Sequence, residues 1–433
     1  MASSAARTLG DIVSLVRGTT YKSAQLGQPG PVLLGLGSIQ RNGGFRADSL
    51  KTYGGESKEK LLLRPGEIYV SLKDVTQSAD LLGAVARVPE SIPLGRLTQD
   101  TVKLDFIDPS YPRGLVYWAL RSPEFRAYCR AHATGTTNLG LAREDFLAFE
   151  LPSPDQELLS LIELLEALET RIELLRQTSA TLEAIAKALF RSWFVDFEPV
   201  RTKFEGREPE GMDAVTAALF PREFEDSELG LIPKGWSCRP LDSIAQFLNG
   251  LALQKFPPES DSEYLPIIKI AQLRAGHTNA ADRASALLKA EYVVEDGDVL
   301  FSWSGSLEVE VWCGGRGALN QHLFKVTSSE VPKWFYFFAT KLHLPKFREI
   351  AADKATTMGH IQRRHLTEAQ VAVPPSKCLE KLSPFFDSVF ERMIVNSLQA
   401  QNLAKVRDAL LTCLTSGQFR ISEAKTKVED SLA

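Results

Sequence analysis

Residues 7–18 of the chain are RTLGDIVSLVRG, and residues 239–250 are RPLDSIAQFLNG. The two segments share the spacing of their apolar residues and the closing glycine, at a constant offset of 232 positions. Self-similarity at a fixed offset is the signature of a repeated architecture. The sequence therefore predicts that one structural unit is present twice.

Two further pairs of segments continue the repeat. Residues 64–71 (RPGEIYVS) match residues 295–302 (EDGDVLFS), with a glycine at the third position of each. Residues 133–152 match residues 354–374, and both stretches run from a Thr-rich turn to an apolar residue followed by proline. A long helical pattern follows each of these prolines. The predicted order is domain, helix, domain, helix.

Both helical segments repeat apolar residues at steps of four and three, which is the heptad pattern of a coiled coil. Ser179 is the one polar position in the first segment, and Asn396 and Arg407 interrupt the second. An antiparallel pair satisfies both apolar stripes most simply, since a buried leucine contributes about 1.5–3 kcal/mol. The alternative is that each helix packs only on its own domain. The predicted seam consists of Leu161, Leu165, Leu168, Ile172, Leu175, Leu182, Leu189, Leu382, Phe386, Val389, Met393, Leu403 and Leu410.

These patterns predict an α+β protein with two homologous mixed α/β domains. Short strands separated by Gly-rich turns, for example at 267–270, alternate with aromatic helices at 115–128 and 334–347. Each domain is followed by one long helix, and the two helices pair as an antiparallel coiled coil with pseudo-twofold symmetry. The predicted segments are a first domain at 1–152, a central helix at 153–197, an acidic ordered linker at 198–235, a second domain at 236–375, a C-terminal helix at 376–418 and a tail at 419–433.

Composition narrows the class of protein. A chain of 433 residues exceeds what one hydrophobic core usually serves. No apolar run approaches the roughly 20 residues of a membrane-spanning helix, and the first residues lack the pattern of an export signal, so we expect a cytoplasmic protein with no membrane association. The five cysteines are odd in number and form no C-x-x-C pair, which favours reduced thiols over disulfides or a zinc site.

The net charge of -4 is unevenly distributed. Residues 1–150 contain 18 basic and 15 acidic residues, and residues 236–375 contain 15 of each. Residues 151–235 contain 9 basic and 17 acidic residues, so most of the excess acid lies in the central helix and linker. The two domains are neutral to weakly basic, which leaves binding to the phosphates of DNA open.

The sequence contains no recognisable catalytic or metal-binding motif. It has no G-x-x-x-x-G-K-[ST] phosphate loop, no H-E-x-x-H and no G-x-S-x-G. His360 and His365 are five residues apart, which places them on different faces of a helix without a third ligand nearby. Glu308 and Glu310 alternate with apolar residues along a strand, so we expect them to face solvent. The sequence therefore predicts neither a catalytic centre nor a metal site.

Side chains that proteins use on DNA are abundant in the predicted turns of both domains. Arg pairs with guanine, Asn and Gln pair with adenine, and Lys, Ser and Thr hold phosphates. For any single residue a solvated surface position is more common, and the hypothesis rests on their repetition at equivalent points of both copies. The candidate DNA-contacting residues are Arg41, Asn42, Arg46, Lys58, Lys60, Lys73, Thr136, Thr137, Asn138, Ser302, Ser304, Ser306, Arg316, Asn320, Gln321, His322, Lys354, Thr356, Thr357, His360, Gln362, Arg363 and Arg364.

The chain resembles the specificity subunits of type I restriction-modification systems over essentially its whole length. In the second domain the resemblance is carried by IPKGW at 232–236, GDVLFSWSG at 297–305, GALNQHL at 317–323 and AADKATTMG at 351–359. In the first domain RPGEIYVSLKDVT at 64–76 is similar to one subgroup of the family. LFRSWFVDF at 189–197 resembles the family's central region.

This resemblance implies that each domain is a target-recognition domain for one half of a split, asymmetric site on double-stranded DNA. It also implies that the helices form a spacer that docks two modification (methyltransferase) subunits, to which ATP-dependent restriction subunits attach. AdoMet, ATP and Mg²⁺ would belong to those partners, and this chain would be a non-catalytic subunit without a cofactor. Arg407 departs from an apolar seam, which puts in doubt how evenly the two helices pack.

Two other functions fit parts of the sequence. A coiled-coil scaffold with two protein- or peptide-binding heads is favoured slightly by the neutral second domain, and only DNA recognition predicts a steep dependence of binding on salt. A self-sufficient restriction enzyme would need a methyltransferase or nuclease motif, and the sequence shows neither.

Overall fold

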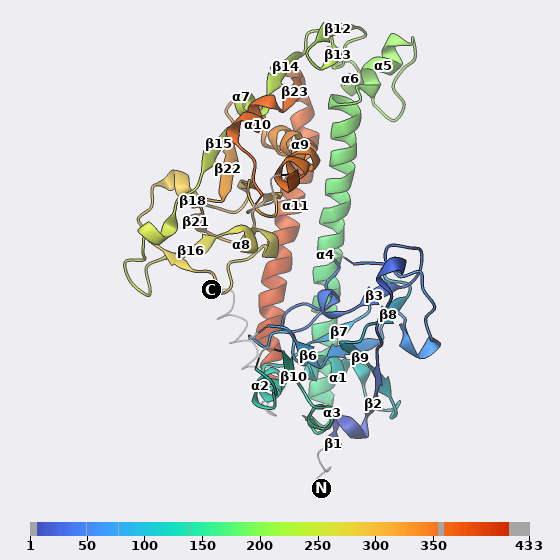
Figure 1. The fold of residues 1–433 in the computed structure, drawn as a ribbon. Coiled ribbons are helices and arrows are strands. Elements are labelled where there is room, and N and C mark those ends of the chain that lie inside the picture. Colours follow the sequence, from blue (N-terminus) through green and yellow to red (C-terminus); the bar gives the residue numbers. More distant parts are fainter. Residues whose placement is uncertain (1–6, 49, 77, 137, 354–358, 415–433) are drawn as a thin grey trace. The chain divides into compact units, whose positions relative to one another are not determined.

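The structure, a computed structural model, describes residues 7–48, 50–76, 78–136, 138–353 and 359–414 (Figure 1). The chain divides into two compact units, of which unit 2 is Glu173–Gln401 and unit 1 is the remainder on both sides of it. Both boundaries lie inside the two long helices, α4 (Gln156–Phe194) and α11 (Ser376–Leu411). Each long helix therefore contributes one part to each unit.

Unit 1 is built on two small sheets and two strand pairs. Its strands are β1 (Arg7–Thr8), β2 (Val13–Arg17), β3 (Val32–Leu34), β4 (Leu62–Leu63), β5 (Ile68–Ser71), β6 (Lys73–Asp74), β7 (Val85–Arg87), β8 (Gly95–Leu97), β9 (Thr101–Phe106), β10 (Leu139–Gly140) and β11 (Glu150–Leu151). The larger sheet has the antiparallel order β2-β9-β5-β7, and the smaller has the order β3-β8-β4 with β3 parallel to β8. The pairs are β1-β11 and β6-β10.

Unit 2 repeats this topology. Its strands are β12 (Phe224–Ser227), β13 (Gly230–Pro233), β14 (Ser237–Pro240), β15 (Gln246–Asn249), β16 (Leu265–Ile268), β17 (Arg283–Ala284), β18 (Val293–Val294), β19 (Val299–Ser302), β20 (Val309–Val311), β21 (Gly317–Leu319), β22 (Leu323–Thr327) and β23 (Gln370–Val373). The sheets are β15-β22-β19-β20 and β17-β16-β21-β18, with β16 parallel to β21, and β14 pairs with β23. Relative to unit 1, β17 and the β12-β13 hairpin are additions. The predicted duplication is confirmed.

The duplication extends to side chains at the turn before β5 in unit 1 and before β19 in unit 2. In unit 1 the Glu67 carboxylate accepts the backbone N–H three residues before it (2.6 Å) and pairs with Lys103. In unit 2 the Asp298 carboxylate accepts the equivalent N–H (2.8 Å) and pairs with Lys325 at 2.7 Å. The glycine before each carboxylate has a φ of 82° or 88°, a conformation that L side chains rarely adopt. This conformation explains why the glycine recurs in the sequence repeat.

The aromatic helix predicted at 115–128 is two helices. They are α1 (Arg113–Ala119) and α2 (Pro123–Ala131), and α3 (Arg143–Leu147) follows later in unit 1. The hydroxyl of Ser122 accepts the N–H of Phe125 at 3.1 Å and so caps α2. Pro123 occupies the first turn of α2, where no backbone donor is needed. The prediction of one helix is wrong because Ser-Pro begins a new helix here.

The helices of unit 2 are α7 (Leu241–Ile244), α8 (Ile270–Ala275), α9 (Lys333–Asp353) and α10 (Arg363–Glu368). The single aromatic helix predicted at 334–347 is confirmed as α9. The strand expected at 267–270 ends earlier, at Ile268, because Ile270 already begins α8. The two units therefore share their sheets but differ in how their aromatic helices are divided.

The acidic segment predicted as a linker at 198–235 is ordered and belongs to unit 2. It contains α5 (Glu198–Phe204), α6 (Ala214–Ala217) and the β12-β13 hairpin. The Asp213 carboxylate caps α6 by accepting the N–H groups of Val215 (2.9 Å) and Thr216 (3.0 Å). Phe220, which follows α6, is buried in the core of unit 2.

The two long helices pack on each other in both units. In unit 1, Leu161 and Leu165 near the start of α4 share a core with Leu410 near the end of α11. In unit 2, the Trp193 ring near the end of α4 lies 5.8 Å from the ring of Phe386 near the start of α11. These contacts make the pair antiparallel, as predicted. Every predicted seam residue is buried or half-buried.

A second face of α4 packs on the domain of unit 2. The Phe190 ring lies 5.5 Å from Phe335 and 5.7 Å from Phe338, both on α9. Helix pairing and packing on a domain, which the sequence presents as alternatives, therefore occur together. The long stretch of apolar and aromatic residues at the end of α4 serves both contacts.

The three polar interruptions of the seam are accommodated differently. Arg407 donates to the Glu169 carboxylate on α4 at 2.6 Å, so the expected irregularity in packing is an ion pair within unit 1. The Asn396 side chain is 1% exposed, and within the described ranges neither its amide nitrogen nor its oxygen has a hydrogen-bond partner. The Ser179 hydroxyl is likewise without a partner there. Unpaired polar groups of this kind cost stability and favour a particular alignment of helices.

Substitution of Phe386 by Ala is expected to lower the free energy of unfolding of unit 2 by about 3–5 kcal/mol. The Phe386 side chain is 0% exposed and stacks on Trp334 with ring centroids 4.1 Å apart. Denaturant unfolding followed by tryptophan fluorescence measures the loss. The matched control is Phe385→Ala, because Phe385 is 44% exposed and should cost less than about 1 kcal/mol. Equal losses in the two variants would contradict the packing described.

Candidate nucleic-acid interface

In both units a segment that follows one strand of the larger sheet pairs with a segment that follows the aromatic helices. The strand is β5 in unit 1 and β19 in unit 2. In unit 1, β6 pairs with β10, and Lys73 lies opposite Gly140. In unit 2, an antiparallel bridge joins Ser304 to His360. We call these segments the paired loops: residues 73–76 with 138–140, and residues 303–306 with 359–362. They occupy equivalent places in the duplicated fold.

The paired loops of unit 2 gather around Trp303. The Ser304 hydroxyl and His322 Nδ1 are hydrogen-bonded at 3.0 Å, and His322 Nε2 lies 3.4 Å from the amide nitrogen of Gln321. The Trp303 ring lies 5.9 Å from the ring of His322 and 6.2 Å from that of His360. The structure thus brings four predicted residues, Ser304, Gln321, His322 and His360, to one place. Ser306 is exposed in the same loop.

Two residues of this cluster, Trp303 and Asn249, were not among the candidates predicted from the sequence. Trp303 is half-buried, and its Nε1–H donates to the Asn249 side-chain oxygen at 3.0 Å. The search for candidates considered polar and basic side chains in turns, which passes over a tryptophan. Strand alternation could not have found it, because all four residues of β19, Val299–Ser302, are buried.

The paired loops of unit 1 are organised by a buried carboxylate. Asp74 is fully buried and accepts the N–H groups of Thr76 (2.7 Å) and Leu81 (2.6 Å), which closes the intervening loop. Asp80 in that loop contacts Arg41 at 3.7 Å, and its backbone oxygen accepts the N–H of Asn42 at 2.9 Å. Arg41 and Asn42 therefore adjoin the paired loops.

Lys73, Thr136 and Asn138 are the exposed candidates on the paired loops of unit 1 and the turn before β10. The Lys73 ammonium lies 3.5 Å from the Asp100 carboxylate. Both partners are at least partly exposed, so this ion pair is weak and leaves the ammonium accessible to a phosphate.

Other candidate residues lie outside the paired loops or form hydrogen bonds and ion pairs within the protein. Ser302 is buried and its hydroxyl donates to the Ser306 carbonyl at 2.6 Å, while Asn320 is buried and its side-chain oxygen accepts the N–H of His322 at 3.2 Å. We therefore leave Ser302 and Asn320 out of the proposed surface. Ser304 is left out for the same reason, because it is 3% exposed and its hydroxyl is bonded to His322. Arg316 pairs with Glu295 at 3.2 Å in a different turn.

In unit 1, Arg46 is bonded to Asp48 at 2.8 Å. Lys58 and Lys60 are exposed around a short helical turn that contacts the edge strand β2.

In unit 2, Gln362 ends the paired loops, and Arg363 and Arg364 begin α10. Both arginines are exposed, and the Arg363 guanidinium donates to the Phe247 carbonyl at 3.1 Å. Four candidates, Thr137, Lys354, Thr356 and Thr357, lie outside the described residues.

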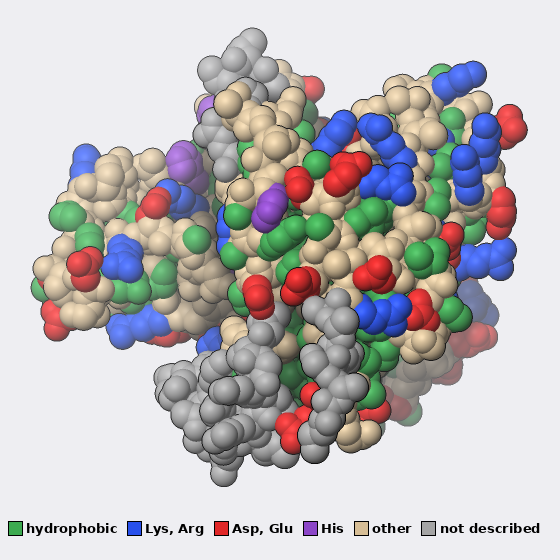
Figure 2. All heavy atoms as spheres, turned by 90° about the horizontal axis from the view of Figure 1, so that it is seen from below, with side chains coloured by type: hydrophobic (Ala, Val, Ile, Leu, Met, Phe, Trp, Pro, Cys, Tyr) green, Lys and Arg blue, Asp and Glu red, His purple; other side chains and the backbone are tan. Residues whose placement is uncertain are grey.

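Basic and acidic side chains alternate on the face drawn in Figure 2. Among the candidate cations, Arg41, Lys73 and Arg316 each have a carboxylate within 4 Å. A mixed surface lowers nonspecific attraction to phosphates. Binding would then depend more on the individual side chains of the paired loops.

The described part of the chain shows no group of three or more His, Cys, Asp or Glu that could hold a metal ion. No disulfide joins the five cysteines, all of which lie within the described residues, and burial raises the pKa of the Cys129 thiol to about 12 and that of Cys313 to about 11. Such thiols are poor nucleophiles at neutral pH. No helix within the described ranges is long and apolar enough to cross a membrane.

Comparison with known proteins identifies relatives of one kind. The type I restriction enzyme MjaIX specificity subunit of Methanocaldococcus jannaschii is 25% identical over 317 residues, which cover 71% of this chain and 69% of the relative. The HindI specificity subunit of Haemophilus influenzae is 23% identical over 63% of this chain and 69% of its own length. No family model matches the chain.

A solved structure shares the fold. The S subunit of a type I restriction-modification system from M. genitalium superposes with a TM-score of 0.51 at 14% identity, over 96% of this chain and 97% of that chain. The match spans both units and both long helices. The duplicated α+β architecture is therefore that of a known class of proteins.

Proposed function

We propose that this chain recognises DNA as the specificity subunit of a type I restriction-modification system, which its similarity to such subunits and its fold support. It would bind a bipartite site through its two units and would itself be non-catalytic. The complex as a whole would act as a DNA adenine methyltransferase and ATP-dependent endonuclease through its partners, in the cytoplasm.

The observation that carries this proposal is the occurrence of one surface twice with different side chains. Equivalent paired loops present Lys73 and Asn138 in unit 1 but Ser306 and His360 in unit 2. Because Asn, Lys, Ser and His form different hydrogen bonds with DNA, two such surfaces would select two different half-sites. An asymmetric, interrupted target follows from this difference.

We further propose that the outer faces of the long helices bind the partner subunits. Leu164, Leu174 and Ile185 on α4 are each about half exposed, although they lie on a helix whose opposite face is in the core. Exposed apolar side chains on a helix favour a protein partner. Two modification subunits would dock there, and restriction subunits would join them. AdoMet, ATP and Mg²⁺ would be bound by these partners.

Sequence-dependent methylation tests the proposed function. The chain is co-expressed with candidate modification subunits, and methylated bases are mapped across the host genome. We expect one interrupted, asymmetric motif that is absent when this chain is omitted. Uniform background methylation in both cultures would contradict the proposal.

Salt dependence separates DNA recognition from a scaffold with two protein-binding heads. Binding of the assembled complex to the mapped site should weaken by at least tenfold between 50 and 200 mM salt, about what release of counterions from several phosphates predicts. Binding to a scrambled site should be weaker at every salt concentration. Salt-independent binding, or equal affinity for both sites, would favour the scaffold.

A further inference from the structure

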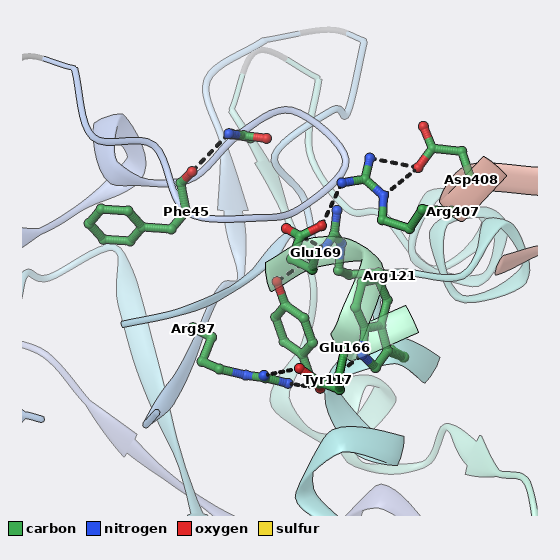
Figure 3. Close-up of polar contacts among 10 residues, drawn as sticks. Phe45, Arg87, Tyr117, Arg121, Glu166, Glu169, Arg407 and Asp408 are labelled. Carbon is green, nitrogen blue, oxygen red and sulfur yellow. Dashed lines mark hydrogen bonds and ion pairs between the residues drawn. The ribbon is translucent and has the colours of Figure 1, made fainter. Parts of the chain in front are cut away.

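Two basic residues join the first domain to α4 within unit 1, and a third joins α11 to α4 (Figure 3). Arg87 on β7 donates two hydrogen bonds of 2.6 Å to Glu166 on α4. Arg121, at the end of α1, lies 3.3 Å from Glu169 on α4, and Arg407 on α11 donates to the same carboxylate at 2.6 Å. Glu169 thus receives one cation from the domain and one from the second helix.

This cluster is partly shielded from water. The Arg121 side chain is only 6% exposed and that of Arg407 is 12% exposed. Desolvation opposes ionisation of Glu169, but the charges of Arg121 and Arg407 outweigh it and lower the pKa of the carboxyl group. The carboxylate is therefore charged at neutral pH, and a buried arginine without it would be strongly destabilised.

Unit 2 has a corresponding contact. Lys341 on α9 pairs with Glu183 on α4, and its side chain is 12% exposed. Lys341 also lies 3.4 Å from Glu310, which is on strand β20 of the same domain. Of these two ion pairs, the one with Glu183 connects the domain to α4. The domain is joined to α11 by hydrogen bonds, which Gln401 donates to the carbonyls of Gly276 (3.1 Å) and Cys313 (2.7 Å) and Trp334 donates to Ser383 (3.0 Å).

The two domain cations occupy equivalent positions. Arg121 stands nine residues after Pro112, and Lys341 stands nine residues after Pro332, at the start of the corresponding aromatic helix. Their partners, Glu169 and Glu183, are 14 residues apart on α4. That distance is two heptads, so both carboxylates lie on nearly the same face of the helix. The partners of Arg121 and Lys341 are thus both on α4, although α11 is the structural repeat of α4.

We infer that Glu169 and Glu183 are positioning residues, which fix the orientation of each recognition domain on α4 and thereby set which spacing of half-sites the protein accepts. The selectivity for spacing rests on the proposed function. A shielded ion pair adds a directional contact between α4 and each domain to the apolar packing around it. Loss of the Glu183 pair should therefore loosen the orientation of the domain while the domain stays folded, because Lys341 keeps its ion pair with Glu310.

The first readout is independent of DNA. Nitroxide labels are placed at the exposed positions Lys187 on α4 and Lys346 on α9, in a background with Cys238→Ser, and the distance distribution is measured by pulsed electron resonance. We expect Glu183→Gln and Lys341→Met to broaden the distribution at least twofold. Lys341→Arg, which keeps the charge, should retain the narrow distribution.

Glu310→Gln is the matched control for this experiment. It removes a carboxylate that contacts the same ammonium, but from within the domain. We expect its distance distribution to equal that of the unsubstituted protein. An unbroadened distribution in Glu183→Gln, or equal broadening in Glu310→Gln, would overturn the inference.

The second readout tests the consequence for DNA. The assembled methyltransferase is assayed on substrates with the mapped gap and with gaps one base pair shorter or longer. Glu169→Gln and Glu183→Gln should each reduce the preference for the mapped gap at least tenfold, and Glu310→Gln should leave it unchanged.

The outcomes distinguish the inference from the proposed function. If Glu183→Gln broadens the distribution of label distances but the preference for the mapped gap is retained, the ion pairs of Glu169 and Glu183 do not set the spacing of the half-sites. If the unsubstituted complex methylates no sequence selectively, the proposed function fails, and with it the claim about spacing. The distance measurement decides the mechanical role of Glu183 in either case.

Discussion

Insertion of one heptad into the middle of both α4 and α11 is expected to lengthen the unspecified gap between the two half-sites by about three base pairs. Seven helical residues add about 10 Å, and duplex DNA rises about 3.4 Å per base pair. A heptad returns the apolar stripe to the same face of the helix, so the antiparallel seam is preserved. Mapping of methylated bases in cells that express the variant measures the gap directly.

Insertion into α4 alone is the control for the double insertion. The facing helix is then one heptad too short, and contacts such as Trp193 with Phe386 in unit 2 and Leu165 with Leu410 in unit 1 cannot both form in their present register. We expect lost cooperativity of unfolding and little or no methylation. A double insertion that methylates the original motif with its gap unchanged would reject the helices as the determinant of spacing.

The second large effect is expected from single substitutions on the paired loops. Gln321→Ala should reduce methylation at the second half-site by about 10–100-fold, because a base-specific hydrogen-bonded contact is worth about 1–3 kcal/mol of discrimination. Asn138→Ala should do the same at the first half-site only. Methylation rates on substrates with one altered base pair in either half-site show which half-site now tolerates the altered base pair.

Arg316→Ala is the matched control for these loop variants. Arg316 is an exposed basic residue of unit 2, but it pairs with Glu295 in a turn outside the paired loops. We expect both half-sites to be retained in this variant. If Gln321→Ala and Arg316→Ala relax the same positions, the paired loops are not the recognition surface.

Features that repeat along the chain were the most predictable from the sequence. The duplicated segments fixed the equivalence of the two units, because a recurring glycine such as Gly66 or Gly297 marks a turn that only a left-handed backbone can make. The heptad spacing predicted the seam, since helix geometry alone determines which residues share a face. These inferences need no knowledge of contacts between distant residues.

Features that depend on distant partners were missed or misjudged. Arg407 interrupts a heptad in the sequence, yet Glu169 neutralises it 238 positions away. Ser302 has the chemistry of a phosphate ligand, but the pairing of β19 with β22 places it in the core. Composition identifies side chains that can bind DNA, whereas tertiary burial decides which of them are accessible.

The shared core of unit 1 has a consequence for biosynthesis. Leu410, Leu411 and Leu414 are buried against residues of the first domain and the start of α4. In translation these leucines follow Leu165 by more than 240 codons, so the amino-terminal domain emerges from the ribosome with an uncovered apolar face. Unit 2 is contiguous in sequence, from Glu173 to Gln401, and can fold first. Of the two units, the one whose first residues are made earlier is thus the one whose core is completed later.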